Sequence, residues 1–366
     1  MNQPHIWLRA ETKPQEQRTA LTPSNAKKLL DAGFQVTVEA STQNIFPDQQ
    51  YKAIGCHLVG QGEWVNAPKD TIILGLKELP EATFPLVHQH IYFAHVYKEQ
   101  QGWQKLLERF KQGEGKLYDL EYLVDDNNRR VAAFGYWAGF AGAALAIQAW
   151  ANQKLGMQPP LKDIKAYADK SELMTDLAEA VNHSPIKPRV IVIGAKGRSG
   201  KGAVDVAKEL SLEVVEWDID ETQRTGPFEE LNSFDILINC VFISGVADDG
   251  SSPVFLNHES LASSQRKLAV ITDVSCDPYG DYNPLPIYQH STTFMQPCIK
   301  VIDKAEQSLN LIAIDHLPSL LPKESSEDYG QQLVKHLLTL GDTSQDVWPK
   351  ASTLFHSKLA EIQKTQ

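Results

Sequence analysis

Two short apolar runs in the first third of the chain each lead to a titratable side chain. Residues 72–77 form a run that stops abruptly at Lys77, and strict alternation over residues 91–97 places His95 in an otherwise apolar row. The other members of that row are Ile91, Phe93 and Tyr97. Both runs predict β-strands. Because open α/β sheets place their chemistry at strand ends, the lysine and the histidine can share one proton-transfer task.

The rest of the first third follows a β-α pattern. Ser24, after Pro23, is expected to cap a helix that continues to Ala32 and ends at Gly33. Further apolar runs predict strands over 6–9, 34–39, 71–76 and 117–123. A long helix rich in glycine and alanine is predicted over 138–155, which suits close packing.

The second part of the chain shows the same pattern more clearly. Residues 189–193 form a continuous apolar run, typical of a buried parallel strand. A helix is predicted over 203–210, and further strands over 212–217, 234–240, 268–273 and 309–314. Polar helices over 328–340 and 347–362 are expected to return to the first domain. We therefore predict an α/β protein with two Rossmann-like domains whose parallel sheets face an interdomain cleft. The boundaries are 1–134 plus 326–366 for the substrate domain and 135–325 for the NAD domain.

A glycine-rich loop follows the strand at 189–193. Gly194, Gly197 and Gly200 are spaced G-x-x-G-x-x-G, and Asp218 follows Gly200 by 18 residues, near the end of the next strand. Such glycines let the backbone approach a pyrophosphate at a helix start, and the acid can accept hydrogen bonds from the adenosine ribose. An acid there repels a 2′-phosphate, so the loop predicts NAD rather than NADP. The alternative is a purely structural strand–helix turn.

Composition narrows the class of protein. The chain has 42% hydrophobic and 22% charged residues and a net charge of −11, with no basic stripe, which argues against nucleic acid as a partner. Cys56, Cys240, Cys276 and Cys298 lack metal-ligand spacing, so no metal site is expected. No signal pattern, peroxisomal ending or run long enough to span a bilayer is present, which predicts a cytoplasmic protein with no membrane partner.

Three arginines stand in predicted strand-end loops. Arg18 follows the first strand, and Arg129 and Arg130 follow a later one. Arginine suits bidentate contact with a carboxylate, although an isolated arginine is more often solvated surface. The simpler interpretations of the two titratable groups are a solvent-facing Lys77 and a core His95 bonded to a backbone carbonyl.

Together these segments resemble the NAD-dependent, lysine-forming saccharopine dehydrogenases, relatives of the alanine dehydrogenase and transhydrogenase fold. The resemblance covers nearly the whole chain and includes long, chemically unusual strings. They lie at 16–23, 75–80, 93–100, 117–121, 129–143, 217–222, 273–275 and 314–322. The resemblance implies that saccharopine, NAD and water give L-lysine, 2-oxoglutarate and NADH, reversibly.

The resemblance also implies a role for each site residue. Lys77 matches the base that deprotonates the secondary amine, and His95 the acid–base group for imine hydrolysis. Burial and Arg18 would lower the pKa of Lys77, whereas Glu78 and Glu121 would raise it. Saccharopine would be held by Arg18, Gln100, Arg130, Phe134, Ser275, Cys276 and Asp277. The cofactor would contact Arg129, Gly197, Arg198, Asp218, Thr222, Phe242, Val274, Ile314, Asp315, His316 and Leu317.

The chain departs from the family pattern at two positions. Ser199 stands where relatives can carry a cysteine facing the position of Cys240, so that pair cannot form a disulfide here. Cys276 replaces a smaller residue and is expected to reshape the substrate wall modestly. Neither change removes a group that the chemistry needs.

Two other functions stay open at this stage. One is a relative acting on a simpler amino acid, such as an alanine dehydrogenase; the paired Arg129 and Arg130 favour a larger, multiply charged substrate instead. The other is a non-catalytic NAD-binding sensor, which the intact Lys77 and His95 disfavour. The sequence leaves open the oligomeric state and the physiological direction of the reaction.

Overall fold

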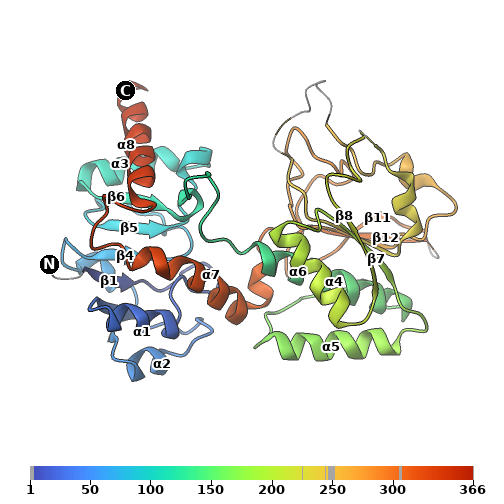
Figure 1. Ribbon diagram of the computed structural model, residues 1–366, viewed down its shortest axis with the longest axis horizontal. Helices are drawn as coiled ribbons and strands as arrows, with labels where there is room; N and C mark the ends of the chain where they lie inside the picture. Colours follow the sequence, from blue (N-terminus) through green and yellow to red (C-terminus); the bar gives the residue numbers. More distant parts are fainter. Residues whose placement is uncertain (1–3, 225, 244, 246–251, 305–306, 366) are drawn as a thin grey trace. The chain divides into compact units, whose positions relative to one another are not determined.

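The computed structural model describes residues 4–224, 226–243, 245, 252–304 and 307–365. The chain divides into two compact units (Figure 1). Unit 1 comprises Met1–Ala133 and Pro322–Gln366, and unit 2 comprises Phe134–Leu321. Both boundaries lie at the start of a helix, where the chain leaves one core for another.

Unit 1 is built on a parallel sheet with the strand order β3-β2-β1-β4-β5-β6. Its strands are β1 (His5–Leu8), β2 (Gln35–Glu39), β3 (His57–Val59), β4 (Ile72–Leu74), β5 (Gln89–Tyr92) and β6 (Lys116–Asp119). The strand order reverses between β1 and β4, which pair from Ile6 opposite Ile72 to Leu8 opposite Leu74. Loops that leave such a switch point on opposite sides open a crevice at the carboxyl edge of a sheet.

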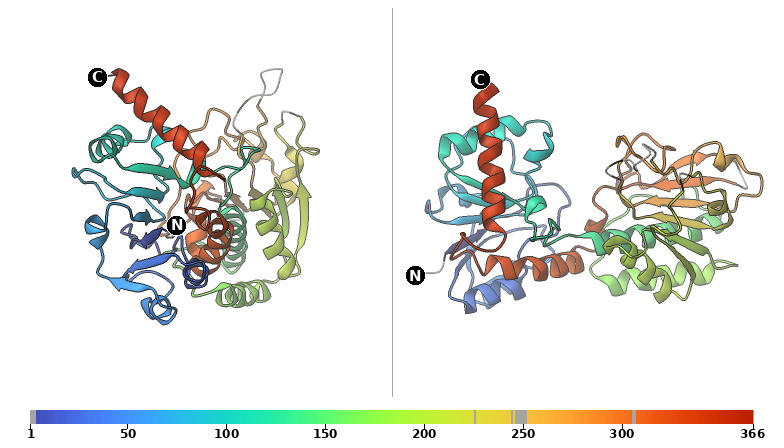
Figure 2. Two further views of the ribbon diagram at one scale, coloured as in Figure 1. Left: turned by 60° about the vertical axis from the view of Figure 1, so that its left-hand side comes forward. Right: turned by 45° about the horizontal axis from the view of Figure 1, so that its top comes forward.

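Five helices complete unit 1 in the described part of the chain. They are α1 (Pro23–Asp31), α2 (Asp48–Ala53), α3 (Trp103–Gly113), α7 (Pro322–Leu337) and α8 (Trp348–Thr365). Both C-terminal helices therefore belong to unit 1: α7 packs against α1, and α8 against α3 and β6 (Figure 2). One apolar cluster joins Phe110 of α3 and Phe355 of α8 to Ile73 of the sheet.

The structure corrects three local predictions in unit 1. The N-cap of α1 is Thr22, whose hydroxyl accepts the N–H of Asn25 at 3.3 Å, because Pro23 occupies the first helical position and Ser24 lies inside the helix. The strand predicted over 91–97 ends at Tyr92, and the strand predicted over 117–123 ends at Asp119. Short 3₁₀ turns, η2 (Val96–Lys98) and η3 (Leu120–Tyr122), follow them closely.

Unit 2 contains a sheet with the order β11-β12-β10-β9-β7-β8. Its strands are β7 (Arg189–Ile193), β8 (Glu213–Trp217), β9 (Ile236–Asn239), β10 (Val270–Asp273), β11 (Ile299–Ile302) and β12 (Leu309–Ile312). The strands run parallel except β11, which pairs antiparallel with β12 at the edge. The order reverses between β7 and β9, and the glycine-rich loop follows β7. The predicted α/β class with mostly parallel sheets is confirmed.

The helices of unit 2 are α4 (Gly135–Lys154), α5 (Lys170–His183) and α6 (Arg198–Glu209), and α4 packs against both others (Figure 1). Two glycines bring α4 and α6 together. A Cβ on Gly139 would lie 1.7 Å from the carbonyl oxygen of Ser199, and one on Gly202 would lie 2.0 Å from that of Tyr136. Although α4 is long and apolar, neither it nor any other helix in the described ranges could cross a membrane.

Candidate active site

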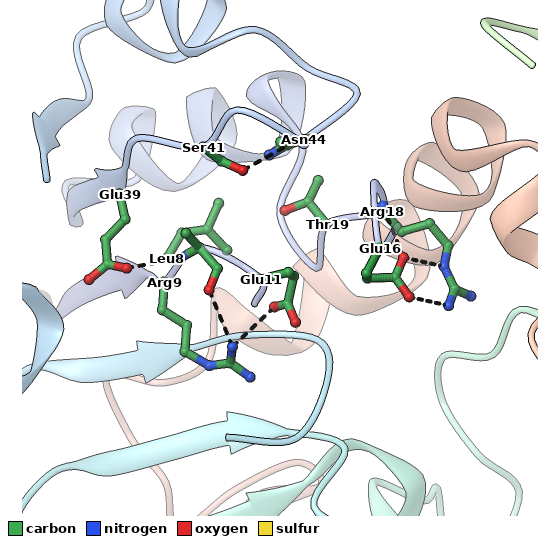
Figure 3. Close-up of a pocket in the computed structure, with 10 residues that line it drawn as sticks. Leu8, Arg9, Glu11, Glu16, Arg18, Thr19, Glu39, Ser41 and Asn44 are labelled. Atoms are coloured by element: carbon green, nitrogen blue, oxygen red, sulfur yellow. Dashed lines mark hydrogen bonds and ion pairs between the residues drawn. The ribbon is translucent and has the colours of Figure 1, made fainter. Parts of the chain in front are cut away.

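Charged side chains lie in the loops that follow β1 and β4 of unit 1, and Figure 3 shows those that follow β1. Arg18 and Glu16 form a two-pronged ion pair, with nitrogen–oxygen distances of 2.8 and 2.6 Å, and each is about 3% exposed. Glu11 accepts the backbone N–H groups of Leu76 and Lys77 at 2.6 and 2.9 Å. The carboxylate of Glu11 therefore ties the loop after β1 to the segment that carries Lys77.

Arg9 also supports the backbone segment that carries Lys77. Its guanidinium lies 3.5 Å from the carboxylate of Glu11 and donates to the carbonyl of Lys77. A Cβ on Gly75 would lie 2.3 Å from Nε of Arg9, so the guanidinium occupies the space that a side chain there would need. The backbone around Lys77 is thus fixed by one buried cation and one buried anion.

Lys77 is half-buried and its pKa is lowered. Burial is the largest cause, Arg18 and Lys13 act in the same direction, and Glu16 and Glu78 oppose them. A lower pKa raises the fraction of neutral amine near neutral pH, which is the form that can accept a proton. The geometry therefore gives Lys77 the character of a base.

His95 lies in the loop that follows β5, close to two carboxylates. Its Nε2 is 3.4 Å from Glu78 and its Nδ1 is 3.9 Å from Glu121. Burial lowers the pKa of His95, and Glu78 and Glu121 oppose that effect without cancelling it. Glu78 thus faces His95 and follows Lys77 directly in sequence, so one carboxylate acts electrostatically on both groups.

Glu121 is the centre of a second set of contacts. Its Oε1 accepts from Lys98 at 3.0 Å and lies 3.3 Å from Arg130. Burial raises the pKa of Glu121, but the cations around it outweigh burial, and the net pKa is lowered. Glu121 stays ionised beside His95.

Three other residues predicted to contact the substrate or the cofactor are Gln100, Arg129 and Phe134. Gln100 and Arg129 are exposed, and the chain crosses into unit 2 at Phe134, the N-cap of α4. Contacts therefore group Glu78, His95, Glu121 and Arg130, and Lys77 joins them through its electrostatic interactions with Glu78 and His95. The exposed side chains of Gln100 and Arg129 have no place in that group.

The glycine loop of unit 2 has the geometry of a phosphate cradle. Gly194 has φ +80°, a region that favours glycine, and a Cβ on Gly200 would lie 2.0 Å from the carbonyl oxygen of Gly194. The helix α6 begins at Arg198, five residues before the predicted start, with Gly197 as its N-cap. The exposed side chain of Arg198 and the first N–H groups of a 12-residue helix therefore lie where an anion is favoured.

Asp218 lies beside this loop. Its carboxylate accepts the N–H of Lys196 at 2.8 Å, and its carbonyl accepts the hydroxyl of Thr222 at 2.9 Å. The acid after β8 is thus attached to the loop after β7, the relation that a ribose-binding acid needs.

A buried polar network follows β9 and β10. Asp273, 1% exposed, accepts from the hydroxyl of Ser275 at 2.6 Å, the amide of Asn239 at 2.9 Å and the hydroxyl of Tyr288 at 2.6 Å. Cys276 has φ +50° and donates its thiol to the carbonyl of Ala313 at 3.1 Å. The network orders the segment that carries Ser275, Cys276 and Asp277. Burial raises the pKa of the Cys276 thiol to about 12, so the thiol is neutral.

The residues that the resemblance matches to the nicotinamide-binding region differ in solvent exposure. Ile314 and Leu317 are each 1% exposed and belong to the core that packs against α4, whereas Phe242 is 63% exposed. Val274 is partly buried against the same core, where its side chain would lie 2.9 Å from a Cβ on Gly142. Asp315 is exposed, and the ring of His316 contacts Phe294 at a centroid distance of 4.7 Å. The side chains of Ile314 and Leu317 serve packing in this structure.

Sequence reasoning missed several groups that build the site. They are Arg9, Glu11 and Asp119 in unit 1 and Asn239, Asp273 and Tyr288 in unit 2. Most of them are polar residues at or just after the end of a parallel strand. That position was the available signal, but a buried charge can be recognised only when its partners, distant in sequence, are known.

The fold and the charged strand ends define a class of protein. A model of the alanine dehydrogenase/PNT N-terminal domain matches residues 7–141. A solved L-alanine dehydrogenase matches the structure with a TM-score of 0.67 and 16% identity, over 98% of this chain and 99% of that one. The chain thus has the fold of the alanine dehydrogenases.

Curated relatives make the assignment more specific. A saccharopine dehydrogenase [NAD(+), L-lysine-forming] from Yarrowia lipolytica is 48% identical over 98% of both chains. An enzyme of the same description from Emericella nidulans is also 48% identical, again over 98% of both. The chain belongs to the NAD-dependent, lysine-forming saccharopine dehydrogenase family.

Proposed function

We propose that this protein catalyses the reversible reaction of saccharopine, NAD and water to give L-lysine, 2-oxoglutarate and NADH. The observation that carries the proposal is the link between Lys77 and His95 through Glu78. Glu78 is 3.4 Å from the ring of His95, follows Lys77 directly in sequence and raises the pKa of both groups. Two proton-transfer groups tuned by one carboxylate suit a reaction with two proton-transfer stages.

The reaction requires a neutral secondary amine. The amine lone pair forms the C=N bond as hydride leaves the glutaryl carbon, so the amine must first lose its proton. Lys77, with its lowered pKa, takes that proton. Water then adds to the imine, the C–N bond of the carbinolamine breaks, and the nitrogen leaves with the lysine. His95 moves the protons of this second stage.

Positive side chains suit a substrate with three carboxylates. Arg18 and Arg130 are the arginines proposed to hold them, and each already contacts a carboxylate of the protein, Glu16 and Glu121 respectively. A substrate carboxylate would share or replace these contacts. The internal pairs limit the cost of gathering cations before substrate binds. Gln100, Phe134, Ser275, Cys276 and Asp277 stay proposed substrate contacts.

The residues of unit 2 fit a dinucleotide. Gly197, Arg198 and the start of α6 would hold the pyrophosphate, and Asp218 would accept hydrogen bonds from the ribose. NAD, when bound, accepts the hydride. Unit 2 is therefore the proposed NAD-binding unit, and unit 1 the proposed substrate-binding unit that supplies Lys77 and His95.

NADH formation with saccharopine, L-alanine and L-glutamate offered separately tests the proposal. We expect turnover with saccharopine and at least about 100-fold lower kcat/KM with the other two, since they lack groups that the site would pair. Equal or preferred use of alanine would show an alanine dehydrogenase. Tight NADH binding without turnover of any of the three would show a binding protein instead.

A further inference from the structure

Asp119 is a buried carboxylate that the reaction outlined above does not use. It ends β6 opposite Tyr92 of β5 and is 1% exposed. Its Oδ2 accepts the backbone N–H of His95 at 2.9 Å, and its Oδ1 accepts the backbone N–H of Glu121 at 3.0 Å. One carboxylate therefore ties together the loops that follow two neighbouring strands.

The backbone of His95 needs such support. It has φ 56° and ψ 18°, a left-handed conformation that a residue with a side chain adopts at a cost. Residues of this kind persist when the surrounding structure fixes them, and they gather at functional sites. The contact to Asp119 fixes the peptide group of His95 directly. The ring is thereby placed 3.4 Å from Glu78 and 3.9 Å from Glu121.

We propose that Asp119 is the positioning residue of the site: it holds His95 in its left-handed conformation and sets the spacing between His95 and Glu121. Asp119 acts through His95, since both of its oxygens face backbone N–H groups of the protein. The inference rests on the role proposed above for His95.

The chemistry of the surroundings supports a fixed carboxylate with few partners. Burial raises the pKa of Asp119 to about 7, Glu121 acts in the same direction, and the N–H groups of Glu121, His95 and Ala94 oppose them. Tyr92, Tyr97, Tyr122 and Tyr329 are close enough that Asp119 raises the pKa of each. A buried carboxylate in this apolar and phenolic setting is costly, so its function lies in the backbone N–H groups that it holds, those of His95 and Glu121 and that of Ala94 beside His95.

The test is Asp119→Asn in a cycle with His95→Gln. Asparagine keeps the volume but has one acceptor oxygen, so it cannot accept the N–H groups of both His95 and Glu121, which bond to different oxygens of Asp119. We expect kcat with saccharopine to fall by about 100-fold, as for a misplaced catalytic group. The affinity for NADH should stay within about twofold, and the pH profile of kcat/KM should lose the limb that belongs to His95. In the His95→Gln background, Asp119→Asn should have little further effect.

A control separates positioning from general damage. Asp342 accepts the N–H and the hydroxyl of Ser344 in the exposed segment between α7 and α8, so Asp342→Asn makes the same chemical change at an exposed position and should leave activity unchanged. Full activity of Asp119→Asn, or multiplicative losses in the double variant, would overturn the proposal. A fully active His95→Gln would instead refute the role of His95.

A crystal structure of Asp119→Asn tests the proposal without measuring turnover. We expect His95 to leave its left-handed conformation in that structure. Unchanged His95 geometry would overturn the proposal.

Discussion

The two sheets of this protein place different chemistry at their carboxyl edges. In unit 1 the loops after β1 and β4 carry charged side chains, with Glu11 holding the backbone of Lys77. In unit 2 the loop after β7 offers glycines and the start of α6, and a Cβ on Gly200 would collide with the carbonyl of Gly194. The same class of parallel sheet thus supports a site made of side chains and a site made of backbone.

The difference follows from what each site must do. A group that moves protons needs a pKa suited to the task, and burial among charges lowers the pKa of Lys77 and His95, the two groups proposed for that task. A group that holds a pyrophosphate needs N–H donors and close approach, which glycines and a helix start provide. Charge changes in unit 1 should therefore alter rate and pH dependence. In unit 2, changes of backbone packing should alter stability, and loss of Asp218 should alter cofactor affinity.

Lys77→Met is the change expected to have the largest effect. Methionine keeps the length of the side chain but cannot accept a proton, so kcat with saccharopine should fall by about 10²–10⁴-fold, the range for a lost general base. The affinity for NADH, measured by fluorescence titration, should stay within about twofold of the parent, because unit 2 is the proposed cofactor-binding unit.

A lysine of the same unit outside the site serves as the control. Lys69 has a side chain 67% exposed and pairs with Glu114 at 3.6 Å, and Lys69→Met should leave both rate and affinity unchanged. Loss of NADH binding in Lys77→Met would contradict the division of labour between the two units.

Asp218→Ala tests the acid of unit 2. The variant should bind NADH about 10–100-fold more weakly, since hydrogen bonds to a charged group contribute about 1.5–3 kcal/mol. At saturating NAD, kcat should change little, the opposite pattern to Lys77→Met. Asp220→Ala is the matched control, because Asp220 is an exposed acid two residues further on that pairs with Lys196 at 3.2 Å. Equal weakening in both variants would mean that general charge, rather than Asp218, sets the affinity.

Gly139→Ala tests the backbone packing that supports the cofactor loop. The new Cβ would lie 1.7 Å from the carbonyl oxygen of Ser199, so α4 and α6 must separate. The free energy of unfolding should fall by about 1–3 kcal/mol, as for other overpacked sites. Thermal or denaturant unfolding measures the change. Gly245→Ala, where a Cβ meets nothing within 4 Å, should have no such effect, and equal stability of the two variants would exclude tight α4–α6 packing as a source of stability.

The sequence predicted the elements with the strongest patterns. The run over 189–193 coincides with β7, because a buried parallel strand needs apolar residues on both faces. Alternation over 91–97 was misleading: the strand ends at Tyr92, since a tertiary contact to Asp119 holds His95 in a left-handed conformation that periodicity does not encode. The antiparallel edge strand β11 and the short strand β3 lacked a local pattern that separated them from loops.

The site was predictable in kind but not in its supporting contacts. Lys77 and His95 were visible because each interrupts an apolar run. Glu11 supports Lys77 across 66 positions of sequence, and Asp119 supports His95 across 24. No local pattern encodes such pairs. The first pair arises from strand order, which puts the ends of the non-consecutive strands β1 and β4 together, and the second joins the ends of the paired strands β5 and β6.

Glu78→Gln should give the smallest effect and the finest test of unit 1. The Glu78 carboxylate raises the pKa of both Lys77 and His95, so its removal lowers both. A base with a lower pKa stays unprotonated to lower pH. The limb of the kcat/KM profile that requires these bases free should therefore move to lower pH, by about one unit or less at such separations.

The control for this shift is Glu81→Gln, an exposed acid three residues further on, which should leave the profile in place. A limb that moves to higher pH, or stays fixed in Glu78→Gln, would mean that the two bases do not sense Glu78. The claim that charged side chains set the pKa values in unit 1, in contrast to the backbone-based loop of unit 2, would then be wrong. A shift in the expected direction with unchanged NADH affinity would show that the charges of unit 1 act on the proton transfers alone.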